Sequence, residues 1–186
     1  MPISLYTMGA QIMKKRAKGY PVKVLVFGPG VPASDATPEQ RKGYEKRCQI
    51  KQEVLKEFPM AEVHFPEDSE MIIIADDIRG QLRKEALQAK LSDIVIILDI
   101  SRGADLEIDH FIPKYSWVRD KVHVFLKEEY FKAYKEEKSL VAEVLKQINP
   151  NQIESFTDED FKSCRIATKM APLAVLSAAY DCIMNS

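Results

Sequence analysis

The chain has 186 residues, of which 46% are hydrophobic and 30% are charged, and its formal net charge is −1. This length suits one domain, and the balance of residues is that of a globular protein with a core, which excludes a disordered chain. A pI near 6.3 argues against binding to nucleic acid through phosphate contacts, which calls for a more basic protein. We therefore expect no nucleic-acid partner.

The cysteines and the apolar segments indicate which kinds of site and which location in the cell to expect. Cys48, Cys164 and Cys182 are widely spaced and form no CxxC motif, so neither a disulfide framework nor a zinc site is indicated. The three histidines are scattered, and we expect no metal. No apolar run reaches the length of about 20 residues that crosses a membrane, and the N-terminus lacks the order of a secretory signal. We expect a cytoplasmic protein that does not contact a membrane.

Residues 3–17 predict a short helix whose basic end, Lys14 to Lys18, suits the negative end of the helix dipole. Such a basic amphipathic helix either caps the core or contacts a membrane or a partner, and we favour the first interpretation. The predicted organisation is an N-terminal helical extension of residues 1–20, followed by a single α/β domain of residues 21–186.

Apolar runs that are rich in β-branched residues alternate with helical patterns along the rest of the chain. The predicted strands are 22–27, 61–65, 94–99, 121–126 and 153–156, and the predicted helices are 38–58, 78–91, a short one from Asp105, 128–148, and one from 157 onward that Pro172 bends or divides. This alternation predicts a doubly wound parallel sheet of about five strands, flavodoxin-like or Rossmann-like, in the order 2-1-3-4-5.

That strand order places the first and third strands side by side, with their helices on opposite faces, and ligands bind beyond the strand ends at such a switch point. The first loop there is Gly28-Pro29-Gly30, which offers backbone N–H groups to a phosphate or sugar oxygen. A plain tight turn explains the same glycines. The loop is neither GxGxxG nor GxxxxGK[ST], so dinucleotide hydride transfer and ATP hydrolysis lose support.

The second loop at the switch point carries a candidate catalytic carboxylate. Asp99 ends the third strand, Ser101-Arg102-Gly103 is the predicted turn, and Glu107 follows in a G-x-x-x-E spacing, in the first turn of a helix from Asp105. A carboxylate at the mouth of a cleft can stabilise or covalently capture the oxocarbenium-like sugar that forms when an N-glycosidic bond breaks. The alternative is an acid that only interacts with the helix dipole.

Several segments resemble the nucleoside 2-deoxyribosyltransferases, and the resemblance covers roughly residues 22–127. In that family the Glu of the G-x-x-x-E segment is the nucleophile, so the resemblance implies that Glu107 is catalytic. Toll/interleukin-1 receptor (TIR) domains share a related fold and can carry a catalytic Glu after the same strand, in that case to cleave NAD. The segments that carry the resemblance are Phe27-Gly28-Pro29-Gly30, Leu91 to Leu98, Gly103-Ala104-Asp105-Leu106-Glu107 and Lys121 to Leu126. The chain departs from the family at Val26, where the family has Tyr, at Asp109, where it has Gly, and at the Ser101-Arg102 pair, which is not a standard element of the family.

Other polar residues near the switch point are candidates for further roles. Asp76 or Asp77 is a candidate for the family's second acid, which contacts the sugar or protonates the leaving base, with a helix N-cap as the alternative role. Asp99 is placed to contact ribose hydroxyls, and Arg102 and Ser101 to contact a phosphate, although for Arg102 we favour a solvated loop residue without a function. The predicted catalytic residues are Glu107, Asp77 and Asp99, and the predicted substrate-binding residues are Phe27, Gly28, Pro29, Gly30, Asp76, Ser101, Arg102 and Gly103.

Two functions from different classes follow. The first is a hydrolase or transferase that acts on the N-glycosidic bond of a nucleoside, a nucleotide or an NAD-like molecule and needs no cofactor. The second is a non-catalytic nucleotide-sensing or TIR-like interaction domain. The stripe of Met170, Leu173, Leu176 and Tyr180 is a candidate dimer face, or it packs in the core. The resemblance implies a homodimer or a higher homo-oligomer, because the related enzymes share site residues across subunits.

Overall fold

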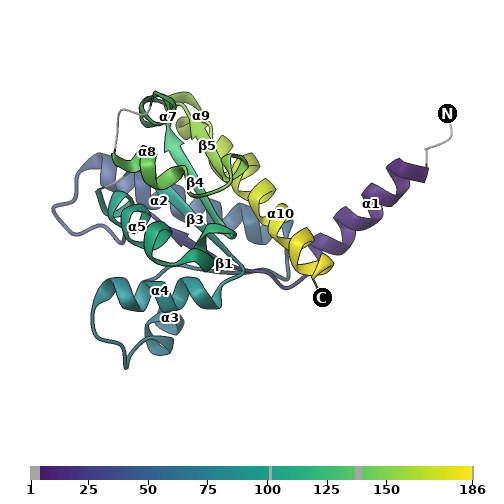
Figure 1. Ribbon diagram of the computed structural model, residues 1–186, viewed down its shortest axis with the longest axis horizontal. Coiled ribbons are helices and arrows are strands. Elements are labelled where there is room, and N and C mark those ends of the chain that lie inside the picture. The colour runs from purple at the N-terminus through teal and green to yellow at the C-terminus, as the bar shows by residue number, and fades with distance from the viewer. Residues whose placement is uncertain (1–4, 101, 137–139, 186) are drawn as a thin grey trace.

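The computed structural model describes residues 5–100, 102–136 and 140–185, with the backbone alone for 5–10, 102–107, 140 and 141. Within these residues one sheet of five parallel strands has the order β2-β1-β3-β4-β5 (Figure 1). The predicted doubly wound α/β fold and its strand order are therefore confirmed. The strands are β1 (Lys23–Phe27), β2 (Glu62–His64), β3 (Ile94–Asp99), β4 (Val122–Lys127) and β5 (Ile153–Phe156).

The central strand β3 explains the strongest apolar run in the sequence. All six of its residues are buried, because helices cover both faces of a parallel sheet and leave no solvent-facing side. It pairs with β1 on one side, where Leu25 is opposite Val95, and with β4 on the other, where Ile97 is opposite Val124. The carboxyl ends of β1, β3 and β4 consequently meet at one edge of the sheet.

Two hydrophobic clusters lie on the two faces of the sheet. One face packs against α2 (Pro38–Glu57), a π-helical turn (Ile166–Met170) and α10 (Ala171–Met184), and Ala17 of α1 (Leu5–Lys18) joins this cluster. Figure 1 shows α1 leaving the body of the molecule beside α10. The opposite face packs against α4 (Gln81–Leu91), α5 (Arg102–Lys114), α6 (Ser116–Arg119) and α8 (Leu140–Leu145).

The start of α2 follows the sequence signal closely. Thr37 is the N-cap and its hydroxyl accepts from the Gln40 N–H at 3.3 Å, while the Gln40 side-chain oxygen accepts from the Thr37 N–H at 2.8 Å. Pro38 occupies the first helical position, where its missing N–H costs nothing. This predicted capping box fixes the entry to α2 just after the Gly28 loop.

The region between β2 and β3 differs from the prediction. A short helix, α3 (Ser69–Ile74), forms where a loop was expected, and its Met71 is buried. The next helix begins only at Gln81, because Gly80 has a φ of +92°, which interrupts a right-handed helix. Asp76 and Asp77 therefore precede α4 by several residues, and neither is its N-cap.

The connection after β3 is shorter than expected. Helix α5 begins at Arg102, so the predicted turn of Ser101-Arg102-Gly103 is wrong for its last two residues, and Ser101 lies outside the described residues. The buried side chains of Ile108, Phe111 and Ile112 anchor α5 on the sheet. Glu107 then falls in the second turn of the helix and not in the first.

The helical predictions for the C-terminal part need two corrections. The predicted helix 128–148 is divided into α7 (Glu128–Lys135) and α8, with 137–139 outside the described residues. The C-terminal helix is divided after α9 (Asp158–Lys162), where Cys164 has a φ of +63°, and not at Pro172. Pro172 lies in the first turn of α10, after a π-helical turn, where the absence of its N–H is tolerated.

The helical stretch Ile166–Met184 is long and apolar enough to cross a membrane by length and composition, but more than half of it is buried inside the domain. Met170, Val175 and Ala179 belong to the core, while Leu176 and Tyr180 pack against it and Leu173 is half exposed. This stretch is therefore the core helix of the α/β domain, and most of the stripe considered as a dimer face packs inside the molecule.

Candidate functional site

The loop after β1 lies close to the end of β3, as the switch-point argument requires. Gly28 has a φ of +145°, a conformation that side chains rarely adopt. A Cβ at this position would also lie 3.3 Å from the carbonyl oxygen of Leu98 and 3.2 Å from Cδ of Arg47. Glycine is therefore required here both by the backbone and by the close packing of the two strand ends.

A buried arginine of α2 fixes this loop through hydrogen bonds to its backbone. Arg47 is 1% exposed, and its guanidinium donates to the carbonyl oxygens of Val26 at 3.1 Å and Pro29 at 2.6 Å. The same group makes two hydrogen bonds of 3.0 Å to the Glu67 carboxylate and lies 4.3 Å from the centre of the Phe65 ring. A planar guanidinium suits this many acceptors at once, so Arg47 joins the loops that follow β1 and β2.

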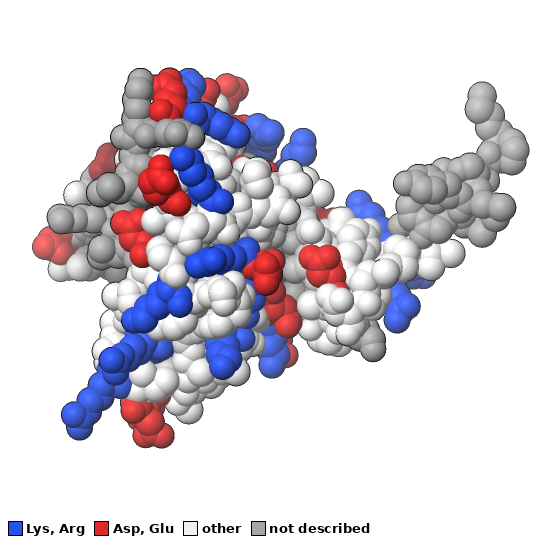
Figure 2. Space-filling model, in the orientation of Figure 1, with Lys and Arg blue, Asp and Glu red and all other residues white. Residues whose placement is uncertain are grey.

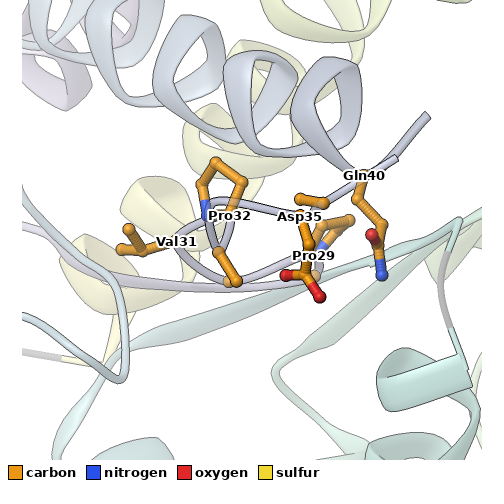
Figure 3. A pocket seen from close by; sticks show the side chains of 9 residues that line it. Pro29, Val31, Pro32, Asp35 and Gln40 are labelled. Atoms are coloured by element: carbon orange, nitrogen blue, oxygen red, sulfur yellow. The ribbon is translucent and has the colours of Figure 1, made fainter. Parts of the chain in front are cut away.

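A second arginine of the same helix fixes the outer part of the loop. The Arg41 guanidinium donates to the carbonyl oxygens of Ala33, Ser34 and Ala36. The loop lines an open pocket of about 490 Å³, and Figure 3 shows the carboxylate of Asp35 and the amide of Gln40 on the same side of it. The lining residues are Gly28, Pro29, Gly30, Val31, Pro32, Ala33, Asp35, Ala36 and Gln40.

A second cavity of about 250 Å³ lies on the β2 side of the same loop and shares Gly28, Gly30 and Val31 with the first. We call the two cavities together the Gly28 cleft. Three ionisable side chains of the cleft line the second cavity and come from α2, from the loop after β2 and from α4, while Asp35 lines the first cavity. The second cavity is lined by Phe27, Gly28, Gly30, Val31, Arg47, Pro66, Glu67, Gln81 and Glu85.

Glu85 is the buried acid of the Gly28 cleft. It is 8% exposed, and the side-chain amide of Gln81 donates to its carboxylate at 2.6 Å. Burial raises the pKa of Glu85 above its usual value, the negative charge of Glu67 adds to the rise, and the hydrogen bond from Gln81 opposes it. A carboxyl group with a raised pKa keeps its proton closer to neutral pH and can act as a general acid.

Helix α5 reaches the cleft through an aromatic contact. The ring of Phe27, which lines the cleft, lies 5.4 Å from the ring of Phe111 on α5. Glu107 precedes Phe111 by one helical turn, and its side chain lies outside the described residues, as does that of Arg102. Gly103 is described as part of the backbone of α5. Asp99 is 3% exposed at the end of β3 and lies on the same face of the sheet as Ile97, which is the α5 face.

The structure thus brings some of the predicted residues together and leaves others apart. Phe27, Gly28 and Gly30 line the cleft with Glu85, and Pro29 lines its outer cavity. Asp76 and Asp77 are exposed between α3 and α4 and are absent from the residues that line it. Sequence reasoning missed Arg47, Glu67 and Glu85. The signal for Arg47 was its place in the buried stripe of α2, which consists of Gly43, Lys46, Arg47, Ile50 and Val54.

Charge is mixed over the surface. Figure 2 shows acidic and basic side chains interspersed on the visible face, with a run of basic ones in the region of α4. No three His, Cys, Asp or Glu side chains gather into a metal-ligand set within the part of the chain that the structure describes. The polar side chains that line the cleft are carboxylates, two amides and a guanidinium, which suit hydrogen bonding and proton transfer.

Comparison of the sequence with models of known protein families gives no match, and comparison with curated proteins gives none. The assignment of function consequently depends on the geometry of the cleft and on the sequence motifs at its edge.

Gly43 provides a test of how tightly α2 packs on the cleft loop. A Cβ at this position would lie 2.6 Å from Cγ of Pro29 and 2.9 Å from Cδ1 of Ile100. Alanine favours a helix over glycine by about 1 kcal/mol, but overpacking against a fixed loop costs about 1–3 kcal/mol. We expect Gly43→Ala to lower the free energy of unfolding by about 1 kcal/mol in urea denaturation.

The control for this substitution is Gly30→Ala in the cleft loop itself. A Cβ at Gly30 would have no neighbour within 4 Å, so we expect its free energy of unfolding to stay within about 0.5 kcal/mol of the wild type. A stability gain in Gly43→Ala would show that the loop yields easily, and would contradict the rigid packing of Pro29 against α2.

Proposed function

We propose that this protein breaks the N-glycosidic bond of a nucleoside or nucleotide, as a hydrolase or a deoxyribosyltransferase, with Glu107 acting at the anomeric carbon. The observation that carries the proposal is the Gly28 cleft at the switch point of the sheet, which holds a buried acid with a raised pKa. Glycosidic chemistry needs two carboxyl groups in different protonation states, and Glu107 and Glu85 are our candidates for them.

The position of Glu107 supports the role of nucleophile. It lies on α5 one turn before Phe111, whose ring contacts the cleft residue Phe27, and residues four apart in a helix share a side. In the proposed reaction the Glu107 carboxylate attacks C1′ and forms an ester with the sugar, while the base leaves with the electron pair of the C–N bond. Water or a second base then displaces Glu107 from C1′.

The leaving base needs a proton, and we propose Glu85 as its donor. The buried Glu85 lines the cleft, whereas Asp77 is exposed and absent from its lining. The raised pKa of Glu85 keeps it protonated at higher pH than an ordinary glutamate. The glycine loop supplies the surface on which the sugar or its phosphate rests, because side chains are missing at Gly28 and Gly30.

The test is the release of free base from a panel of nucleosides, nucleotides and NAD, followed by chromatography. We expect Glu107→Gln to lower kcat/KM by about 10³-fold or more, because the amide cannot form the ester. The matched control is Glu70→Gln, whose side chain is exposed beside His64 and is outside the cleft lining. Equal rates for the wild type and Glu107→Gln would reject the role of Glu107. Binding without base release by the wild type would favour a nucleotide-sensing domain.

The pH dependence of the same reaction tests Glu85. Because the reaction needs Glu85 protonated, we expect the rate of the wild type to fall as pH rises through its raised pKa. Glu85→Gln is expected to lower kcat about 10²-fold and to remove this alkaline decline. The variant Asp77→Asn decides which of the two acids protonates the base. If Asp77→Asn loses activity and Glu85→Gln keeps the activity of the wild type, the proton donor is Asp77.

A further inference from the structure

A separate cavity of about 540 Å³ lies beyond the ends of β3 and β4, between α2 and α9. We call it the lysine cavity. Its volume falls within the range of small-molecule sites, which is about 300–1,000 Å³. The cavity is lined by Glu39, Lys42, Glu45, Lys46, Gln49, Ile100, Lys127, Asp158, Phe161, Lys162 and Cys164. It shares none of these residues with the Gly28 cleft.

Lys46 is the unusual residue of this cavity. It is 4% exposed, and its ammonium lies 5.0 Å from the centre of the Phe161 ring. No carboxylate of the described chain lies within ion-pair distance of it. Its stem is buried, but the nitrogen is not among the buried polar atoms without a partner in the described chain, so the ammonium opens onto the cavity. One aromatic ring compensates its charge only in part, and an anion in the cavity would complete the pairing.

The other inner groups of the cavity are also donors. Lys127 is half-buried at the end of β4, and none of the ion pairs of the described chain involves it. The carbonyl oxygen of the Gln49 side chain accepts from Sγ of Cys164 at 3.3 Å, which leaves the amide N–H groups of Gln49 for a ligand. Two ammonium groups and an amide suit an oxyanion with several acceptor oxygens.

The acids of the cavity do not neutralise this inner surface. Glu39, Glu45 and Asp158 are all exposed, so they form the rim and their charges are screened by water. None of them lies within 4.0 Å of a lysine nitrogen in the ion pairs of the described residues. The electrostatic preference of the cavity is therefore set by its buried part, which is positive.

We propose that the lysine cavity binds the phosphate group of a small phosphorylated molecule, with Lys46 and Lys127 as its charged ligands. Phosphate is favoured over a carboxylate because its oxygens can accept from both ammonium groups and from the Gln49 amide at once. The site does not depend on base release at the Gly28 cleft. Neighbouring residues of α2 face the two places, since Lys46 lines the lysine cavity and Arg47 lines the cleft.

The experiment is calorimetric titration of the full chain with inorganic phosphate, ribose 5-phosphate and citrate at constant ionic strength. We expect saturable binding of a phosphate probe that weakens about tenfold or more in Lys46→Met and in Lys127→Met. The matched control is Lys51→Met on the same helix, whose ammonium pairs with Asp68 at 2.9 Å outside the cavity. It is expected to bind like the wild type.

The comparison of the two phosphate probes identifies the kind of ligand. If ribose 5-phosphate binds much more tightly than inorganic phosphate, the ligand is a phosphate ester. If both bind equally, the ligand is the free anion. Lys127 is half-buried, so its variant keeps the test valid if Lys46→Met fails to fold. No saturable binding of either phosphate probe would overturn the proposal. So would equal affinity in the wild type and both cavity variants, or tighter binding of citrate than of phosphate.

Discussion

Replacing Arg47 by methionine is expected to lower the free energy of unfolding by about 2–4 kcal/mol, because it removes the buried partner of the half-buried Glu67 and leaves buried carbonyl oxygens without a donor. The Glu67 carboxylate loses two hydrogen bonds, and the carbonyl oxygens of Val26 and Pro29 lose their donor in a buried setting. The measurement is urea denaturation at neutral pH. Arg47→Lys is also expected to destabilise, since a single ammonium cannot reach all these acceptors.

The matched control removes an arginine from an exposed ion pair. Arg165 donates to Asp160 at 2.8 Å, and half of its side-chain surface is exposed. Exposed pairs contribute little, so we expect Arg165→Met to change the free energy of unfolding by less than about 1 kcal/mol. Similar losses in Arg47→Met and Arg165→Met would contradict the argument that Arg47 joins the loops after β1 and β2.

Acid is expected to destabilise the fold through His123. Burial lowers the pKa of His123 from 6.5 to about 4, and its Nδ1 is buried without a hydrogen-bond partner in the described chain. The unfolded state therefore binds a proton that the folded state refuses between these two values, so the stabilisation from His123 is complete above pH 6.5 and falls as pH decreases towards 4. The full loss is about 3 kcal/mol.

The measurement is the free energy of unfolding of the wild type and of His123→Gln at a series of pH values between 7 and 4. Glu85 and Glu154 have raised pKa values and shift stability in the opposite direction, but they are common to both proteins and cancel in the difference. We expect the free energy of unfolding of the wild type, relative to that of His123→Gln, to decrease as the pH falls from 7 to 4. A difference that stays constant over this range would contradict the burial of a neutral His123.

The fold could be predicted because it depends on apolar runs that only a covered sheet can accommodate. The bounds of β3 and β5 agree with the prediction, and the alternation with helices leaves few topologies for a parallel sheet. Two of the boundaries that failed depend on single backbone conformations: Gly80 and Cys164 have positive φ values, which delay the start of α4 and separate α9 from the helix that follows it. A cysteine rarely adopts such a conformation, so the local sequence pattern does not predict it.

The candidate site was only half predictable. The glycine loop followed from the switch point, since backbone geometry at the end of a parallel strand is encoded locally. Lys46, Arg47 and Glu85 were not found because charged residues are normally assigned to the solvent side of a helix, and their burial depends on loops that are distant in sequence. All three occupy positions of the buried stripes of α2 and α4, so ionisable residues in an apolar stripe deserve weight as site candidates.

The two edge strands of the sheet affect how copies of this protein can associate. The edge strands β2 and β5 have only three and four residues, against six in β3 and β4. Short edges expose few unpaired N–H and C=O groups, which protects a sheet from pairing with another copy. We therefore expect the chain to resist edge-to-edge aggregation, and any assembly of identical subunits to form through helical surfaces.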